Sequence, residues 1–142
     1  MSSLALEVAK YIVTKCNRDD FPVTNTRLQK ILYCIQRDYF KMHDKCAFED
    51  DFEAWPLGPI IPEVYQEFYY FSSAPITCTY ADIDLNKLDV ALIDSVIEDK
   101  RKLSSWELIQ EIHHAGSAWY KTYIVNDGYK RIIVKELIKM DA

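Results

Sequence analysis

The sequence predicts a mainly α, compact helical domain of about six to seven helices, spanning residues 1–142 as a single domain. Three observations predict it. Apolar residues recur at the helical spacing of three to four positions through most of the chain. Helix-capping residues precede several of these stretches. Hydrophobic residues make up 49% and charged residues 27% of the chain, which is typical of a globular domain with its own core.

The first two helices are the clearest. A stripe of Leu4, Val8 and Ile12 predicts one helix over residues 3–16. Capping residues for a second helix lie within Val23-Thr24-Asn25-Thr26, where Thr26 has capping-box spacing to Gln29. Its apolar face is expected to contain Leu28, Ile31, Leu32, Ile35, Tyr39 and Met42, with Arg27, Lys30, Arg37 and Asp38 largely on other faces. A short loop favours antiparallel packing of the two helices.

An acidic segment follows the second helix. Glu49, Asp50 and Asp51, with Glu53 beyond, are expected to form an exposed loop. A catalytic carboxylate pair is one alternative, but such a pair needs environments that separate its two pKa values, and nothing in this solvated run raises the pKa of one carboxyl against its neighbours. A docking surface for a basic partner is the other. The sequence leaves these interpretations open.

A proline-rich stretch then predicts a rigid connector. Pro56, Pro59 and Pro62 each fix their own φ and push the preceding residue away from helix. We expect an extended arm, a corner at Gly58, and a third helix that Pro62 begins. The stretch should set how the parts on either side of it meet, because it has few conformations to lose on folding.

The middle of the chain mixes helix and strand signals. The third helix is expected over residues 62–71. Alternating apolar and polar residues predict a strand over residues 76–80, which would pair with the arm at residues 52–55 in a short two-stranded β pair. The fourth helix, capped by Asp84 or Asn86, is expected to bury Leu88, Leu92, Ile93 and Val96.

The C-terminal third predicts three more helices. Ser104 and Glu107 form a capping box for the fifth helix, whose inner side is expected to carry Trp106, Ile109, Ile112 and His113. Gly116 suits a left-handed position after the fifth helix, and Ser117 caps a short helix. The last helix is expected to bury Ile132, Ile133, Leu137 and Met140.

Charge, cysteines and apolar runs indicate the class of protein. A net charge of −5 disfavours non-specific binding to nucleic acid or to an anionic membrane. No apolar run approaches the roughly 20 residues of a membrane span, and no signal peptide is evident, so we expect a cytoplasmic protein. The cysteines are expected to be reduced, with a zinc site that includes His43 as the alternative; they are Cys16, Cys34, Cys46 and Cys78.

The sequence contains no familiar catalytic motif. It lacks a phosphate-binding glycine loop, a His-Glu-x-x-His zinc motif and a nucleophile elbow, so we expect no enzyme activity, cofactor or metal. His113 and His114 diverge on a helix, and we expect one against the core and one in solvent. The two helices between Ser104 and Ile124 have helix-turn-helix spacing, so a DNA-binding regulator is a second hypothesis. Residues 100–102 would then contact phosphates.

Three segments together resemble the Panacea domain family, which includes SocA-like antitoxins and phage-associated GepA-like proteins. They are Phe52-Glu53-Ala54-Trp55 through Gly58-Pro59 to Pro62-Glu63-Val64-Tyr65, Val23-Thr24-Asn25 with Leu28-Gln29-Lys30-Ile31-Leu32-Tyr33, and Trp106-Glu107-Leu108 through Ile112-His113 to Trp119. The chain departs from the family pattern at Leu57, Ile112 and Ala118. The order and separation of the segments match over nearly the whole chain.

The resemblance implies a prophage-associated antitoxin that neutralises a cognate protein toxin by direct binding and without catalysis. For SocA-like members it also implies delivery of the toxin to a AAA+ protease. The signature residues that carry it are Glu53, Trp55, Pro56, Gly58, Pro59, Pro62, Tyr65, His113 and Trp119. The partner-binding candidates are Glu49, Asp50, Asp51, Trp55, Tyr69 and Tyr70. An exposed strand edge could also support a homo-oligomer.

Overall fold

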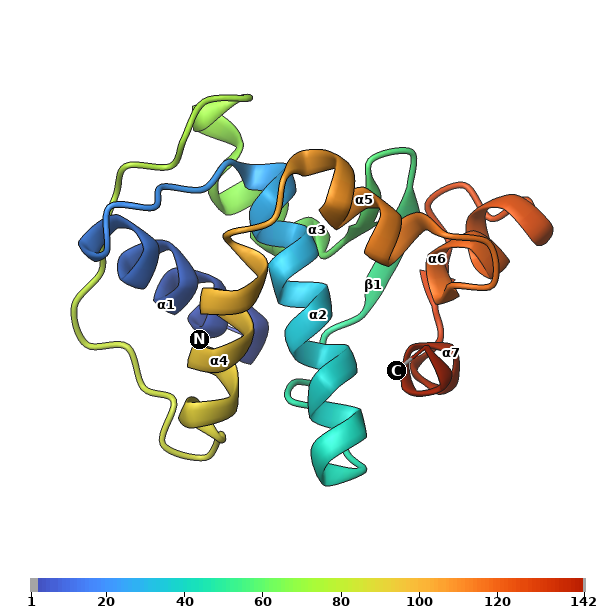
Figure 1. Ribbon diagram of the computed structural model, residues 1–142, viewed down its shortest axis with the longest axis horizontal. Helices are drawn as coiled ribbons and strands as arrows, with labels where there is room; N and C mark the ends of the chain where they lie inside the picture. The colour runs from blue at the N-terminus through green and yellow to red at the C-terminus, as the bar shows by residue number, and fades with distance from the viewer. Residues whose placement is uncertain (1–2, 142) are drawn as a thin grey trace.

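A computed structural model describes residues 3–141 and places one long helix, α2 (Asn25–His43), at the centre (Figure 1). α1 (Leu4–Arg18) and α4 (Val90–Lys100) lie on one side of it. α3 (Pro62–Glu67), α5 (Ser105–His113) and α7 (Lys135–Met140) also pack against α2. The predicted mainly helical class is confirmed, and a small sheet accompanies the helices. No helix within residues 3–141 has both the length and the apolar character needed to cross a bilayer.

The N-cap of α2 lies two residues before the expected capping box at Thr26. Thr24, not Thr26, is the N-cap, and its hydroxyl accepts a hydrogen bond from the Arg27 amide. The expected apolar face is buried except at Met42, whose side chain is 65% exposed because the last turn extends beyond the core. Lys30 and Arg37 were expected on outer faces but are both buried. Neighbouring elements therefore cover more of α2 than one stripe.

Charged side chains join α1 to α4. The Tyr11 hydroxyl donates to Asp94 over 2.5 Å. The Lys15 ammonium pairs with Glu98 at 2.9 Å, and beyond the helix Arg101 pairs with Asp19 at 2.9 Å. The N-cap of α4 is Asp89, so the prediction of Asp84 or Asn86 as the cap is wrong. The Asp84 carboxylate instead accepts a hydrogen bond from the Asn86 amide in the preceding loop. A long connection over residues 72–89, without helix or strand, leads to this cap.

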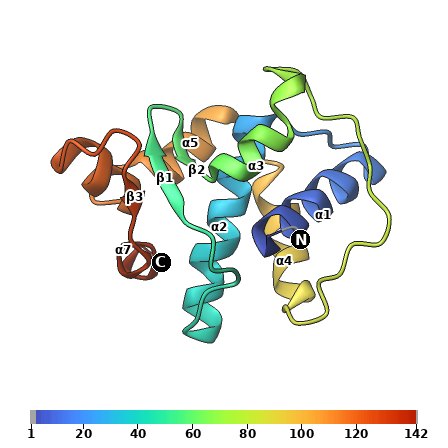
Figure 2. The same ribbon diagram turned by 180° about the vertical axis from the view of Figure 1, so that it is seen from behind.

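The sheet forms between partners that the sequence did not predict. β1 (Phe52–Trp55) lies between β2 (Gly58–Ile60) and β3 (Ile132–Ile133), and both pairings are antiparallel (Figure 2). The expected strand at residues 76–80 is wrong. Its backbone amides bond to the N-terminal part of the chain instead of to a strand. The Ile76 amide donates to the Val23 carbonyl, and the Tyr80 amide donates to the Thr14 hydroxyl. The expectation that Ile132 and Ile133 belong to the last helix is also wrong.

The capping residues predicted for the shorter helices α5 (Ser105–His113) and α6 (Ala118–Tyr120) are present in the structure. α3 ends at Glu67 and a 3₁₀ turn, η1 (Tyr69–Phe71), continues it. Both hydrogen bonds of the Ser104–Glu107 capping box are present at the start of α5. Ser117 caps α6 (Ala118–Tyr120), which runs into a π-helical turn, η2 (Lys121–Val125). Trp106 was expected on the inner side of α5, yet it is 69% exposed because no element covers the first turn on that side.

The cysteines agree with reduced thiols. All four are free; Cys16 and Cys34 are buried, and Cys46 and Cys78 are half-buried. Within residues 3–141, no group of three histidine, cysteine or acidic side chains gathers at metal-binding distance.

Two residues of the same α2 stripe test this description of the core. Replacing the fully buried Ile35 by alanine should lower the free energy of unfolding by about 2–5 kcal/mol, because it leaves a cavity. Met42→Ala should change it by less than about 0.5 kcal/mol, because that side chain is exposed. Urea titration measures both. Equal losses in the two variants would contradict the described burial.

Candidate functional site

Polar side chains of α2 hold the backbone around the proline-rich connector. The Gln29 side-chain carbonyl accepts from the Ile61 amide at 3.0 Å, and its amide nitrogen donates to Asn25 at 3.2 Å. Asn25 in turn donates to the Tyr65 carbonyl at 3.0 Å. The Lys30 ammonium donates to the Leu57 carbonyl at 2.9 Å. Two of the three Panacea-like segments are therefore joined by hydrogen bonds.

The third segment closes on the same hairpin. The Trp119 indole donates to the Trp55 carbonyl at 2.8 Å, and the His113 ring stacks on Trp119 at 4.2 Å between ring centroids. Gly58 has a φ of +115°, and a Cβ built on it would lie 2.7 Å from the Nε2 atom of His113. Glycine is thus required at this position for two reasons, backbone conformation and space.

His113 is held as a neutral ring. Burial and the nearby Lys30 ammonium lower its pKa to about 4. Its Nε2 atom is buried and, among residues 3–141, has no hydrogen-bond partner. His114 is exposed and lies against the end of α5. The expectation of one inward and one outward histidine is confirmed.

Two of the aromatic partner-binding candidates, Trp55 and Tyr69, are linked through the signature residue Tyr65, and we call these three residues the aromatic strip. The ring centroids of Trp55 and Tyr65 are 5.3 Å apart, and those of Tyr65 and Tyr69 are 6.0 Å apart. Lys130 lies 4.7 Å above the Trp55 ring, whose indole nitrogen donates to Glu53. Tyr69 is 62% exposed, and its neighbour Tyr70 is 89% exposed. β1, α3 and η1 thus present aromatic side chains together.

The acidic candidates lie on a different part of the structure and are partly used in packing. The Asp50 carboxylate accepts from the Ala5 amide at the start of α1. Lys135 of α7 donates to the Glu49 carbonyl and pairs with Asp51, each at 2.8 Å. The segment therefore ties the two ends of the chain to the core, and its carboxylates are not all available to a partner.

The residues of the expected DNA-reading element are used in packing. Trp119 and Thr122 are buried, and Tyr123 stacks on Trp119 at 5.0 Å. Two of the three cations that would contact phosphates are already paired: Lys100 with Glu111 at 2.5 Å and Arg101 with Asp19. This arrangement does not favour readout of bases by the second helix.

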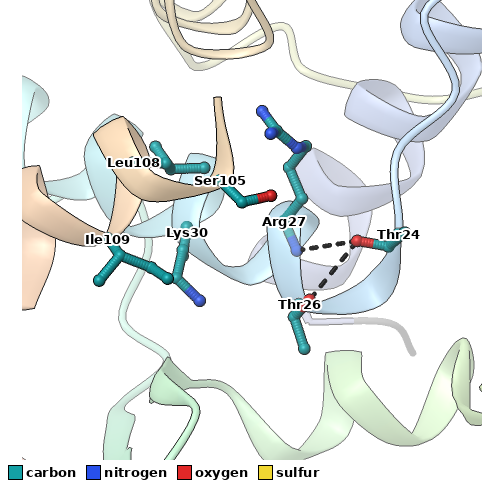
Figure 3. Close-up of a pocket in the computed structure, with 7 residues that line it drawn as sticks. All are labelled: Thr24, Thr26, Arg27, Lys30, Ser105, Leu108 and Ile109. Atoms are coloured by element: carbon teal, nitrogen blue, oxygen red, sulfur yellow. Dashed lines mark hydrogen bonds between the residues drawn. The ribbon is translucent and has the colours of Figure 1, made fainter. Parts of the chain in front are cut away.

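A small pocket lies between α2 and α5, and it was not predicted from the sequence (Figure 3). Its volume is about 100 Å³, and it is lined by Thr24, Thr26, Arg27, Lys30, Ser105, Leu108 and Ile109. The three-residue spacing of Arg27 and Lys30 puts them on one face of α2, and that signal was visible in the sequence. Their enclosure was not, because it depends on where α5 packs.

The contact between Gly58 and His113 predicts a measurable loss of stability. Gly58→Ala should lower the free energy of unfolding by more than about 2 kcal/mol, because strain at positive φ adds to the clash with His113. Gly116→Ala is the matched control: its φ is +94°, but nothing lies within 4 Å of the added Cβ. Thermal and urea unfolding should show the larger loss at Gly58. Equal losses would remove the proposed role of His113.

The neutral state of His113 predicts a pH dependence. The pKa of His113 in the folded protein is about 4, below the ordinary value of 6.5. The contribution of the neutral ring to folding stability is therefore fully present above about pH 6.5 and is lost as the pH falls towards 4. Because solvent screens a ring that is only partly buried, the loss between pH 7 and 4.5 should be on the order of 1 kcal/mol. His113→Gln should flatten this slope in urea titrations, whereas the exposed control His114→Gln should not. Parallel slopes in all three proteins would contradict the prediction.

Comparisons with known proteins agree with the resemblance. The family model described as "Antitoxin SocA-like, Panacea domain" matches residues 28–120. Antitoxin SocA of Caulobacter vibrioides (strain NA1000 / CB15N) is 34% identical over 64 residues, which cover 45% of this chain and 34% of that protein. The match thus spans about a third of the relative's length. No solved structure matches the chain. Since the family match covers more than half of the sequence, the protein belongs to the SocA-like antitoxin family and carries a Panacea domain.

Proposed function

We propose that this protein neutralises a cognate protein toxin by binding it directly, without catalysing a reaction. Membership of a family described as SocA-like antitoxins supports the antitoxin role. One structural observation supports direct binding: the hairpin and α3, both inside the family match, present the aromatic strip at the surface.

The aromatic strip has the properties of an interface anchor. Aromatic side chains contribute much of the binding energy at protein interfaces. Trp55 and Tyr65 are fixed edge to face, and the Trp55 indole nitrogen is already satisfied by Glu53 at 2.9 Å. The hairpin below is bonded to α2, so little conformational entropy would be lost on binding. Tyr69 and Tyr70 extend the surface outward.

The charged groups of the described residues support binding more than catalysis. Although burial raises the pKa of Glu111, hydrogen bonds from Lys100 and Arg37 bring it below its ordinary value. Hydrogen bonds from Arg101 and Lys15 likewise lower the pKa of Asp19. These displaced pKa values belong to structural ion pairs that join helices, whereas a general acid or base needs a substrate-facing position.

Two further parts of the hypothesis stay predictions from the resemblance and the sequence. They are the delivery of a bound toxin to a AAA+ protease and the formation of a homo-oligomer. A DNA-binding role has less support, because the element between Ser104 and Ile124 uses Trp119 and Thr122 for packing.

Co-expression tests the proposal. The open reading frame adjacent to the gene should arrest growth when expressed alone, and co-expression of this protein should restore growth. The two proteins should also co-purify as a complex that size-exclusion chromatography resolves from each component. Toxicity that persists in the presence of this protein, or an adjacent frame that is harmless alone, would overturn the assignment.

Variants locate the interface. Tyr69→Ala and Tyr70→Ala should each weaken binding to the toxin by about 5- to 30-fold, because each removes an exposed aromatic contact. Isothermal titration calorimetry measures the affinity, and circular dichroism checks folding. Met42→Ala, an exposed apolar side chain at the far end of α2, is the control and should bind normally. Full affinity in both tyrosine variants would exclude this face as the interface.

A further inference from the structure

The pocket between α2 and α5 is built from cations and hydroxyl groups. The Lys30 ammonium and the Ser105 hydroxyl face the space between the helices, and the Arg27 side chain rises along its other side (Figure 3). Thr26 closes the lower side of the view, and Leu108 and Ile109 supply an apolar wall. None of the residues that line it carries a carboxylate. The pocket is therefore a positively charged site in an acidic protein.

Lys30 is a buried cation without a counter-ion. It is 8% exposed, and its only hydrogen bond among residues 3–141 goes to the Leu57 carbonyl, although an ammonium group has three donors. Burial first, and the charge of Arg27 second, lower its pKa. The Nη1 atom of Arg27 is also buried and, within the described chain, has no partner. Uncompensated cations of this kind are costly.

The other well-buried cations of this protein are neutralised. Lys15 pairs with Glu98 at 2.9 Å, and Arg37 pairs with Glu111 at 2.8 Å. Both are as buried as Lys30. Within the part of the chain that the structure describes, Arg27 and Lys30 have no such carboxylate. Lys15 and Arg37 therefore have carboxylate partners, whereas Arg27 and Lys30 lie beside a cavity without one among the described residues.

Backbone dipoles add to the positive potential. Thr24 caps α2, and Ser105 is the first residue of α5, so the N-terminal ends of two helices meet at the pocket. Helix N-termini carry a partial positive charge and favour anions. These dipoles act together with the two side-chain cations.

We propose that this pocket is an oxyanion-binding site that takes a single carboxylate or phosphate group. Its volume of about 100 Å³ equals the space of roughly three water molecules, enough for one such group but not for a nucleoside. The charges of Lys30 and Arg27, which lie on opposite sides of the Ser105 hydroxyl in Figure 3, would attract the group, and the Ser105 hydroxyl would donate a hydrogen bond to it. The site is independent of the aromatic strip and of the proposed antitoxin role.

Titration of the ¹⁵N-labelled protein with small anions tests the site. Sodium acetate and inorganic phosphate are added separately, with chloride holding the ionic strength constant. We expect saturable shifts at the amides of Thr26, Arg27 and Ser105 and at the Arg27 side chain. Arg27→Gln and Lys30→Met should each weaken the affinity by at least about tenfold. Lys102→Gln, an exposed cation just before α5, is the control and should leave it unchanged.

The outcomes separate the sources of the anion. Saturation by both anions supports a site that an acidic side chain of a partner can fill, and saturation by phosphate alone supports a free phosphate ligand. The absence of saturable shifts with either anion would overturn the proposal. Equal affinity in the wild-type protein and both pocket variants would overturn it too. Arg27 is only half-buried, so its variant tests the site even if Lys30→Met disturbs folding.

Discussion

The buried hydrogen bonds from α2 to the hairpin are the interaction on which the rest of the structure depends. Gln29 is fully enclosed, and both ends of its amide are used, one on the Ile61 backbone and one on Asn25. Loss of this side chain would leave a buried backbone donor unpaired, at a cost of about 1–3 kcal/mol. The position of the hairpin decides where Trp55 lies and gives the Trp119 indole its acceptor.

The same face of α2 creates an electrostatic contrast inside an acidic protein. Away from the hairpin, buried cations such as Arg37 are paired with carboxylates. Beside the hairpin, Lys30 bonds to a backbone carbonyl, and its charge helps to keep His113 neutral. A neutral imidazole can stack closely on Trp119 and face the bare backbone of Gly58. Lys30 therefore contributes to both features: it lines the cationic pocket, and its charge adds to the effect of burial in lowering the pKa of His113.

The family signature is mainly a description of the scaffold. Gly58, Pro59 and Trp119 are buried, and His113 is largely enclosed. Around this framework the structure exposes Tyr69 and Tyr70 and half-exposes Trp55. Under the proposed function a partner contacts these outer aromatic residues, whereas the inner residues hold the surface in place. Changes to the two groups should therefore have different effects, on affinity in the first case and on folding in the second.

Local patterns in the sequence were sufficient for much of the helical framework. The capping box at Ser104, the cap at Ser117 and the left-handed conformation of Gly116 depend on residues a few positions apart, and the structure contains all three. Trp55 and Tyr69 were partner-binding candidates from the sequence; the structure half-exposes Trp55 and exposes Tyr69, and their role in binding stays a prediction. In these cases, the interactions that decide the conformation lie within one segment of the chain.

Tertiary structure decided what lies opposite each segment. Alternation predicted a strand over residues 76–80, but pairing needs a partner in space, and β1 pairs with residues 132–133 instead. Helical spacing put Met42 and Trp106 on apolar faces, but both side chains are exposed. Helical spacing also placed Lys30 away from the buried face of α2, whereas the hairpin and α5 enclose this side chain beside Arg27. Periodicity determines which residues share a face; burial and charge pairing depend on contacts between segments far apart in the chain.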